Sequence, residues 1–208
     1  AGAIDGVVAI GDDDFPAHRG SVKNSERPIF LFYKGDLSLL SAKSKNIAVI
    51  GLLNPTREIE IAERNLVSGL VENGAVIVSG LAVGCDSIAH LQALDSKGKT
   101  IAILPSPLND IMPAKNKDLA KDIVASGGLL ISEYLTAPKS KMELSGRYQE
   151  RDRLQALFSN SIVLSASYAK NDLGNDSGSR LAMGYAKEYS IPRSVIYDQE
   201  LHFSNPMF

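Results

Sequence analysis

Short apolar runs that end in glycine alternate with helical patterns along most of the chain, and this alternation constrains the fold more than any other sequence feature. Residues 47–50 are apolar throughout and stop at Gly51, which is typical of a strand covered on both faces. A helical pattern follows, with a suitable N-cap at Thr56 and a stop at Asn73-Gly74. The same unit recurs: strands are predicted at 75–78, 99–104, 129–131, 162–164 and 194–196, and helices at 56–73, 86–97 (with Asp86 as N-cap), 115–125, 149–159 and 179–189.

Strands that alternate with helices of this length predict βαβ units in a doubly wound, mainly parallel sheet, with helices on both faces. The predicted fold class is therefore α/β with three layers. Another strand is predicted within Pro28–Gly35, whereas the polar, turn-rich residues 1–27 predict only a loosely structured lead-in. We expect an N-terminal extension with one short initial strand at 1–45, followed by one domain at 46–208.

The charge and cysteine content narrow the function classes. The net charge is −2, so the chain as a whole does not attract nucleic acid, and any such binding needs a local basic patch. Cys85 is the single cysteine, which excludes an intrachain disulfide and fits a reducing compartment. Neither a secretory leader nor an apolar run of roughly 20 residues is evident, so we expect a cytoplasmic protein without a membrane association.

Three glycine-bearing turns follow predicted parallel strands, and each precedes a helix. They lie at 51–56, 80–86 and 175–179. The carboxyl ends of parallel strands meet at one edge of a sheet, where ligands bind. Helix starts present unpaired N–H groups, glycine allows an anion to approach, and Ser177 and Ser179 add hydroxyl donors. The turns therefore predict a phosphate-binding site, although any one of them can also be a plain strand-to-helix turn that needs glycine.

Two basic segments could line the same edge. Lys115 follows the third strand of the repeating unit and could meet a phosphate as a point charge, or it could be a solvated lysine. The segment 147–153 is the densest arginine cluster and contains Tyr148, a combination that suits contacts with phosphates and bases. The alternative for this cluster is an exposed helix face on which Glu150 and Asp152 pair with the arginines.

No catalytic constellation stands out, so we expect a binding protein without a metal or cofactor. His18, His90 and His202 are scattered and have no ligand spacing to Cys85. Cys85 lacks an evident base nearby and reads as a small apolar filler rather than a nucleophile. The phosphate loop of NTPases, G-x-x-x-x-G-K-[ST], is absent.

Several motifs together resemble the DprA/Smf (DNA-processing protein A) family over residues 28–197. The most specific is 78–94, VSGLAVGCDSIAHLQAL, which is similar to the family's [VI]-S-G-L-A-x-G-I-D-x-x-A-H-x-x-A-L. Further matches are PIFLFYKG at 28–35, IAVIGLLNPT at 47–56, the segment 108–116, GGLLISE at 127–133, the segment 148–159, and the S-G-[ST] triplet at 177–179.

The resemblance implies an extended Rossmann-like fold that usually forms a homodimer. It implies binding of single-stranded DNA and assistance to a RecA-type recombinase in DNA uptake, natural transformation and recombination, with no established catalytic activity. It also implies that the DNA backbone is held in a pocket of glycine turns and basic residues. The matching positions are Gly51, Thr56, Ser79, Gly80, Gly84, Asp86, Lys115, Asn116, Arg151, Arg153, Ser177, Gly178 and Ser179.

The chain departs from the family pattern at informative positions. Leu53 stands where the first turn carries a phosphate-binding arginine, and Asp152 replaces the asparagine of R-N-R. Losing one phosphate contact is expected to weaken DNA binding and to reduce its salt dependence by about one charge. The alternative function is a small-nucleotide-binding protein or a nucleotide-cleaving enzyme on a related core. The P-G-G-x-G-[ST] signature of cytokinin-activating phosphoribohydrolases, which share that core, is absent.

Overall fold

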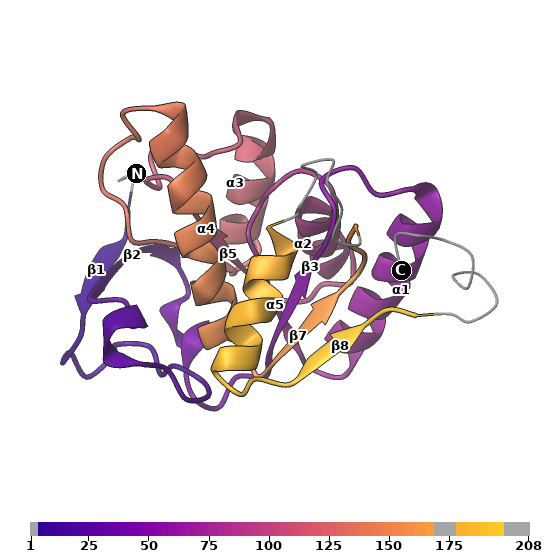
Figure 1. The fold of residues 1–208 in the computed structure, drawn as a ribbon, viewed down its shortest axis with the longest axis horizontal. Coiled ribbons are helices and arrows are strands. Elements are labelled where there is room, and N and C mark those ends of the chain that lie inside the picture. Colours follow the sequence, from indigo (N-terminus) through magenta and orange to yellow (C-terminus); the bar gives the residue numbers. More distant parts are fainter. Residues whose placement is uncertain (1–3, 169–177, 198–208) are drawn as a thin grey trace.

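An eight-stranded sheet with the strand order β1-β2-β6-β5-β4-β3-β7-β8 forms the centre of the structure (Figure 1). The computed structural model describes residues 4–168 and 178–197. Strands β3 to β8 run parallel to one another, whereas β2 runs antiparallel to both β1 and β6. The strands span Gly6–Ala9 (β1), Phe30–Gly35 (β2), Asn46–Ile50 (β3), Val76–Ser79 (β4), Thr100–Leu104 (β5), Leu129–Ser132 (β6), Ser161–Leu164 (β7) and Arg193–Val195 (β8).

Helices cover both faces of this sheet, which confirms the predicted doubly wound α/β architecture with its mainly parallel strands. In Figure 1, α4 and α5 lie in front of the sheet, and α1, α2 and α3 lie behind it. None of the helices among the described residues has the length and apolarity that a membrane span requires. The helices span Arg57–Glu72 (α1), Cys85–Asp95 (α2), Lys117–Ala125 (α3), Lys141–Leu157 (α4) and Ser179–Glu188 (α5), with 3-10 turns at Asn24–Glu26 (η1), Leu37–Leu40 (η2) and Ala114–Asn116 (η3).

The core explains why the central strands are apolar at most positions. Along β3, Ala48 and Ile50 pack in the cluster on the α4 and α5 side, whereas Val49 packs with residues of α1 and α2. Alternate side chains of a strand point to opposite faces, so a strand covered on both faces needs apolar residues throughout. Burial of the central strands on both faces fixes their ends, and therefore fixes the turns that follow them.

The sequence predictions differ from the structure at two elements. Residues 6–9 were expected in a loose lead-in, but they form β1 and pair with β2, because backbone pairing at a sheet edge needs little apolar periodicity. The predicted helix at 149–159 begins earlier, at Lys141. Ser140 caps it by accepting the Glu143 N–H, and the Glu143 carboxylate accepts the Lys139 N–H, an arrangement that stabilises a helix start with few apolar residues.

Candidate functional site

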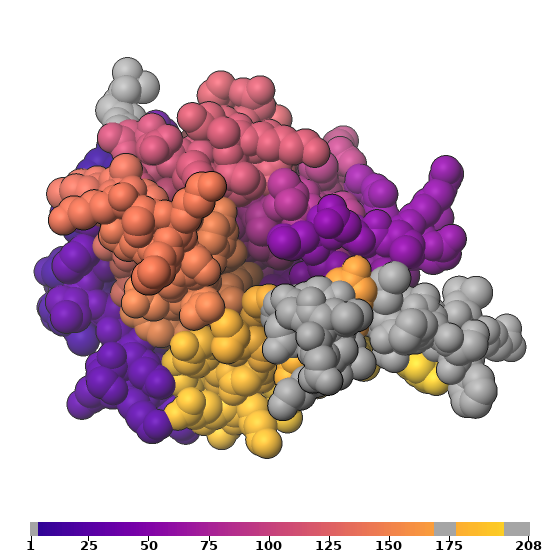
Figure 2. All heavy atoms as spheres, turned by 45° about the horizontal axis from the view of Figure 1, so that its top comes forward, coloured from indigo at the N-terminus to yellow at the C-terminus, as the bar shows by residue number. Residues whose placement is uncertain are grey.

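A cleft of about 670 Å³ opens at the carboxyl ends of β3, β4 and β7. The chain runs from β3 to β6 on one side of β3 and then places β7 on the other side, so the cleft lies where the strand order reverses. Figure 2 shows the orange surface of α4 facing the purple surface of the segment after β3 across this hollow. The lining comprises Ile50, Gly51, Leu52, Leu53, Asn54, Ala82, Val83, Asp86, Pro113, Tyr148, Arg151, Asp152, Gln155, Tyr168, Gly178 and Ser179.

The first two glycine turns interlock beside the cleft. A Cβ at Gly51 would lie 2.5 Å from the Cys85 Sγ, and one at Gly84 would lie 2.3 Å from the Leu52 carbonyl oxygen. Gly84 also has a φ of 80°, a conformation that suits glycine. The Cys85 N–H donates to the Leu52 carbonyl at 2.9 Å, so the start of α2 is attached directly to the turn after β3. The prediction that the turns gather at one sheet edge is confirmed for these two.

Helix α2 begins at the cleft, at Gly84, without a side-chain cap. Thr56 and Ser140 cap α1 and α4, whereas α3, whose start does not line the cleft, also lacks a side-chain cap. The first N–H of α2, from Cys85, already donates to the Leu52 carbonyl. An uncapped start leaves the other backbone donors of its first turn for water or a ligand. The start of α2 is therefore a place where the cleft can receive an anion.

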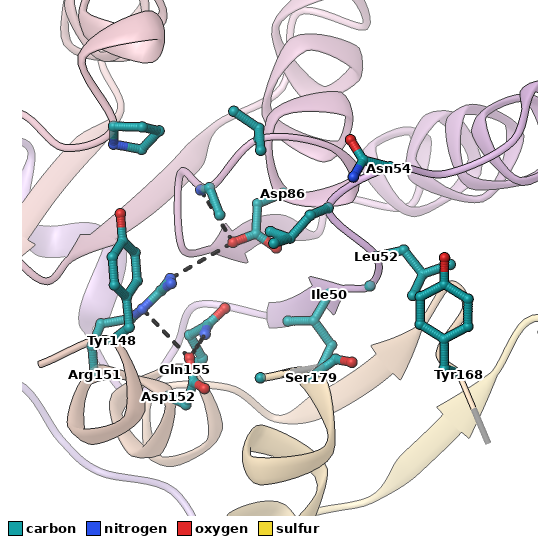
Figure 3. A pocket seen from close by; sticks show the side chains of 16 residues that line it. Ile50, Leu52, Asn54, Asp86, Tyr148, Arg151, Asp152, Gln155, Tyr168 and Ser179 are labelled. Atoms are coloured by element: carbon teal, nitrogen blue, oxygen red, sulfur yellow. Dashed lines mark hydrogen bonds and ion pairs between the residues drawn. The ribbon is translucent and has the colours of Figure 1, made fainter. Parts of the chain in front are cut away.

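Loop amides add to these donors. The backbone N–H groups of Leu53, Asn54 and Val83 have no hydrogen-bond partner within residues 4–168 and 178–197. All three residues line the cleft. Tyr148 and Tyr168 stand on opposite sides of it in Figure 3, so aromatic faces flank the donors. Together these groups offer an anion backbone contacts and offer a base stacking surfaces.

The second turn is less open than the sequence indicated. The Asp86 carboxylate accepts the N–H groups of Gly80 and Ala82 at 3.1 and 3.3 Å, so an internal carboxylate already occupies these donors. Asp86 was expected to be the N-cap of its helix, and this is wrong: Gly84 is the N-cap, and Asp86 reaches back from within the first turn of α2. The carboxylate therefore stabilises the loop rather than the helix end.

Two further predicted site residues hold the second turn in place. Asn116 is buried, and its Nδ2 donates to the carbonyls of Leu81 and Ala82 at 2.8 and 3.2 Å. The buried Ser79 hydroxyl donates to the Val49 carbonyl at 2.7 Å, which ties β4 to β3. Neither side chain lines the cleft. Their contacts position the turn from behind.

Arg151 lies between two carboxylates on the wall of the cleft (Figure 3). Its Nη1 lies 3.7 Å from Asp86 Oδ2, and its Nε lies 3.4 Å from Asp152 Oδ1. A Cβ at Gly80 would lie only 1.1 Å from Arg151 Nη1, so the glycine creates the space that the guanidinium fills. The Tyr148 ring lies 5.5 Å from the guanidinium carbon. Arg151 is almost fully buried and contacts β5 through the Ile103 carbonyl, α2 through Asp86 and α4 through Asp152.

Burial raises the pKa of Asp152 to about 7, with Arg151 opposing the shift and Asp86 adding to it. Burial, followed by the repulsion of Arg151, lowers the pKa of His90 to about 3, so this imidazole is neutral. Its Nδ1 lies 2.6 Å from the Thr100 hydroxyl, which agrees with a structural role. Burial also raises the pKa of the Cys85 thiol, consistent with an unreactive filler.

Arg153 does not reach the cleft. Although it is two positions after Arg151, its guanidinium points to a second cavity and bonds both oxygens of Glu133 at 2.7 Å. It also donates to the carbonyls of Glu26 and Glu150. The physical reason is the helical rotation between the two positions, which turns their side chains to different neighbours. The arginine cluster therefore divides between two sites.

The remaining predicted residues have varied positions. Gly178 and Ser179 line the cleft, whereas Ser177 lies outside the described residues. Lys115 is exposed and comes shortly after Pro113, which lines the cleft. Thr56 serves as the cap of α1.

Sequence reasoning omitted Asn54, Gln155 and Tyr168 from the site. Tyr168 closely follows the carboxyl end of β7, and Gln155 lies one helical turn after Asp152. These two positions could have predicted from the sequence that both residues line the cleft.

The fold and the cleft place the chain among the Rossmann-like α/β proteins that bind ligands at the carboxyl edge of a parallel sheet. The chain belongs to the DNA recombination-mediator protein A family, whose model matches residues 6–200. It is 32% identical over 190 residues to DNA processing protein DprA of Streptococcus pneumoniae, covering 89% of this chain and 62% of that protein. The chain thus spans less than two thirds of this relative.

Solved structures agree with this assignment. The structure of DNA processing protein A from Streptococcus pneumoniae superposes with a TM-score of 0.75 at 33% identity, covering 95% of this chain and 64% of the other. DNA processing protein A from Helicobacter pylori, reported for its single-stranded DNA binding mode, superposes with a TM-score of 0.71 at 30% identity. That match covers 92% of this chain and 83% of the other.

Proposed function

We propose that this chain binds single-stranded DNA in the cleft and acts as a binding and loading protein rather than an enzyme. One observation carries the proposal: the uncapped start of α2 and the amides of Leu53, Asn54 and Val83, which have no partner among the described residues, converge on a cleft flanked by Tyr148 and Tyr168. Backbone N–H groups suit phosphates, and aromatic rings suit unstacked bases, whatever the sequence of the strand. The binding mode reported for the Helicobacter pylori relative supports the same ligand.

The proposal assigns DNA contacts to fewer residues than the sequence predicted. Phosphates meet the amides of Leu53, Asn54 and Val83 and the uncapped start after Gly84. Lys115 supplies a mobile positive charge at the rim, as an exposed lysine can. Arg151 contacts the Asp86 and Asp152 carboxylates, and its buried positive charge offsets their negative charge in the cleft. Family membership supports a RecA-type recombinase as the partner and a homodimer as the working form.

The direct test is a titration of the purified chain with a fluorescently labelled 30-nucleotide single strand, measured by anisotropy. We expect saturable binding that weakens as salt increases, and weaker binding of the corresponding duplex. Unlabelled competitors identify the ligand class. If a mononucleotide displaces the strand at a comparable concentration, the cleft is a small-nucleotide site and the proposal is wrong.

Restoring the arginine of the family pattern gives a second test. Leu53 is 58% exposed on the first turn, so Leu53→Arg adds a cation at the cleft without disturbing the core. We expect single-strand affinity to rise about threefold at low salt, and the slope of log affinity against log salt to steepen by about 0.7. The matched control is Ile29→Arg, which adds the same charge at an exposed residue of the second cavity. Equal gains in both variants would show that net charge, not the cleft, governs binding.

A further inference from the structure

The α4 wall of the cleft carries hydrogen-bond acceptors that the protein itself does not satisfy. Gln155 Nε2 donates to Asp152 Oδ1 at 2.9 Å, which holds the two side chains side by side (Figure 3). Within the described residues, Asp152 Oδ2 has no hydrogen-bond partner, and the buried Gln155 Oε1 has none either. Buried polar atoms normally have partners, so unpaired acceptors in a cleft point to a ligand that donates.

Among the described residues, the start of α5 leaves space beside one oxygen of the Asp152 carboxylate. A Cβ at Gly178 would lie 3.2 Å from Asp152 Oδ2, so the glycine at the start of α5 keeps space above this oxygen. Arg151 approaches Oδ1 rather than Oδ2, at 3.4 Å. Asp152 and Gln155 are 6% and 2% exposed, so a group that reaches them is shielded from water. A hydrogen bond to an ionised acceptor is strongest under such conditions.

A carboxylate in a cleft that binds a polyanion opposes binding unless it recognises something other than phosphate. Single-stranded DNA offers the edges of its unstacked bases. Guanine is the base whose Watson–Crick edge places two donors, N1–H and the 2-amino group, next to each other. Thymine presents one N–H between two carbonyl oxygens, and these oxygens would face the carboxylate unfavourably. A two-acceptor group therefore matches guanine and rejects thymine.

We infer that the cleft selects guanine in the bound strand, with the Asp152 carboxylate accepting N1–H and the 2-amino group. This inference rests on the proposed single-stranded DNA binding. Gln155 orients the carboxylate through its amide, and Tyr148 and Tyr168 are the aromatic surfaces that can stack on the base. An asparagine at 152, as in the R-N-R pattern, has one acceptor and one donor on its amide, so it lacks this selectivity.

The test compares 15-nucleotide strands with the unmodified chain. One strand is all thymine, and the others carry guanine, hypoxanthine or 7-deazaguanine at every fifth position. We expect guanine and 7-deazaguanine, which share the same Watson–Crick edge, to bind at least tenfold more tightly than thymine. Hypoxanthine lacks the 2-amino group and is expected to lose most of this gain. Discrimination of this size is typical of a bidentate base contact.

Asp152→Asn then assigns the effect to the residue. We expect this variant to bind the all-thymine strand at least as well as the unmodified chain, and its guanine preference to fall within twofold. Glu150→Gln is the matched control, since it removes a negative charge from the same helix at the second cavity. This control should retain the full preference. Thermal unfolding of both variants checks that each remains folded.

The outcomes distinguish failure of guanine selection from failure of single-stranded DNA binding. Equal binding of thymine and guanine strands overturns guanine selection but leaves single-stranded DNA binding intact. A preference that survives in Asp152→Asn overturns the role of this carboxylate. Failure to bind any strand overturns the proposed function and the inference together. A preference that is lost with hypoxanthine and in Asp152→Asn, but kept in Glu150→Gln, supports the inference.

Discussion

Arg151 and Arg153 lie two positions apart on α4, yet their surroundings are opposite in character. Arg153 is saturated: it forms two bonds of 2.7 Å to Glu133 and further bonds to the carbonyls of Glu26 and Glu150. Arg151 has only long contacts, at 3.4 to 3.7 Å, and its Nε makes no hydrogen bond of good geometry within the described residues. Arg153 therefore completes a structural network of hydrogen bonds, and Arg151 belongs to an incomplete one.

The same contrast extends over both cavities. Around Arg153, the Tyr134 hydroxyl donates to Glu150 at 2.6 Å, whereas the buried Glu26 Oε2 has no partner among the described residues. Around Arg151, again within the described residues, the cleft keeps loop amides without a partner, the uncapped start of α2 and the unpaired Gln155 Oε1. An unsatisfied buried group costs free energy in the unbound protein, and a ligand that satisfies it recovers this cost. Incomplete pairing at the cleft therefore distinguishes Arg151 from Arg153, although the two side chains carry the same charge.

The largest expected effect is on stability, from Arg153→Met. Removing this partner leaves Glu133 partly buried without its cation, which is expected to lower the free energy of unfolding by about 3 kcal/mol. Affinity for single-stranded DNA should stay within twofold, because the cleft is untouched. Chemical denaturation and anisotropy measure the two quantities.

The double replacement Arg153→Met with Glu133→Leu is the control for that result. It also removes the Glu133 carboxylate that Arg153→Met leaves unpaired, and should recover much of the lost stability. If Arg153→Met instead weakens DNA binding while stability is retained, the comparison between the two arginines is wrong, and Arg153 contacts the strand.

The next effect concerns a carboxyl behind the cleft. Glu63 of α1 is completely buried, and burial raises its pKa to about 8, partly offset by Cys85 and Ser165. The folded state then holds a proton that the unfolded state releases near pH 4.5. Stability is fully present below that pH and is lost as the pH rises through about 8. From pH 5 to 8 the loss attributable to this group is about 3 kcal/mol.

Glu63→Gln keeps the shape of the neutral acid, so we expect this variant to lose less stability than the unmodified chain between pH 5 and 8. Glu72→Gln, at an exposed position of the same helix, should follow the unmodified chain. Urea denaturation at both pH values gives the comparison. Parallel pH profiles for the unmodified chain and Glu63→Gln would show that this carboxyl ionises normally in the fold.

Sequence reasoning located the sheet, the turns and the sheet edge, because burial imposes apolar periodicity and glycine marks close backbone approach. The Gly51 and Gly84 contacts are of this kind, and the motifs at 78–94 identified the family. Periodicity does not report edge pairing, so β1 was not predicted. It also did not report that a capped polar segment starts α4 at Lys141.

The site was harder to predict, because the type of a residue does not determine which partner its side chain contacts in the fold. Arg151 and Arg153 are identical residues in one cluster, and only their tertiary neighbours separate them. Asp86 illustrates the same limit: its position suggested a helix cap, whereas its carboxylate accepts the amides of the preceding loop. The direction of the parallel strands was enough to predict the sheet edge at which the site lies. Which groups at that edge remain unpaired depends on side-chain packing, which the sequence does not show.

The smallest expected effect is on affinity, from Arg151→Met. Without the guanidinium, Asp86 and Asp152 face the bound phosphates uncompensated, so we expect single-strand affinity to fall about tenfold at pH 8, or about 1.4 kcal/mol. Burial already raises the pKa of Asp152 to about 7, and losing the neighbouring cation raises it further. Protonation at pH 6 removes part of the repulsion, so the loss should be smaller there.

Arg147→Met is the matched control for this variant. Arg147 is a buried arginine of the same helix, but it pairs with Glu143 and lies over the Tyr134 ring, outside the cleft. Its replacement should reduce stability and leave affinity within twofold at both pH values. Anisotropy titrations of both variants at pH 6 and 8 decide the matter, because equal losses would mean that general damage to α4 weakens binding. A loss confined to Arg151→Met and larger at pH 8 would assign binding to the incompletely paired side of the helix.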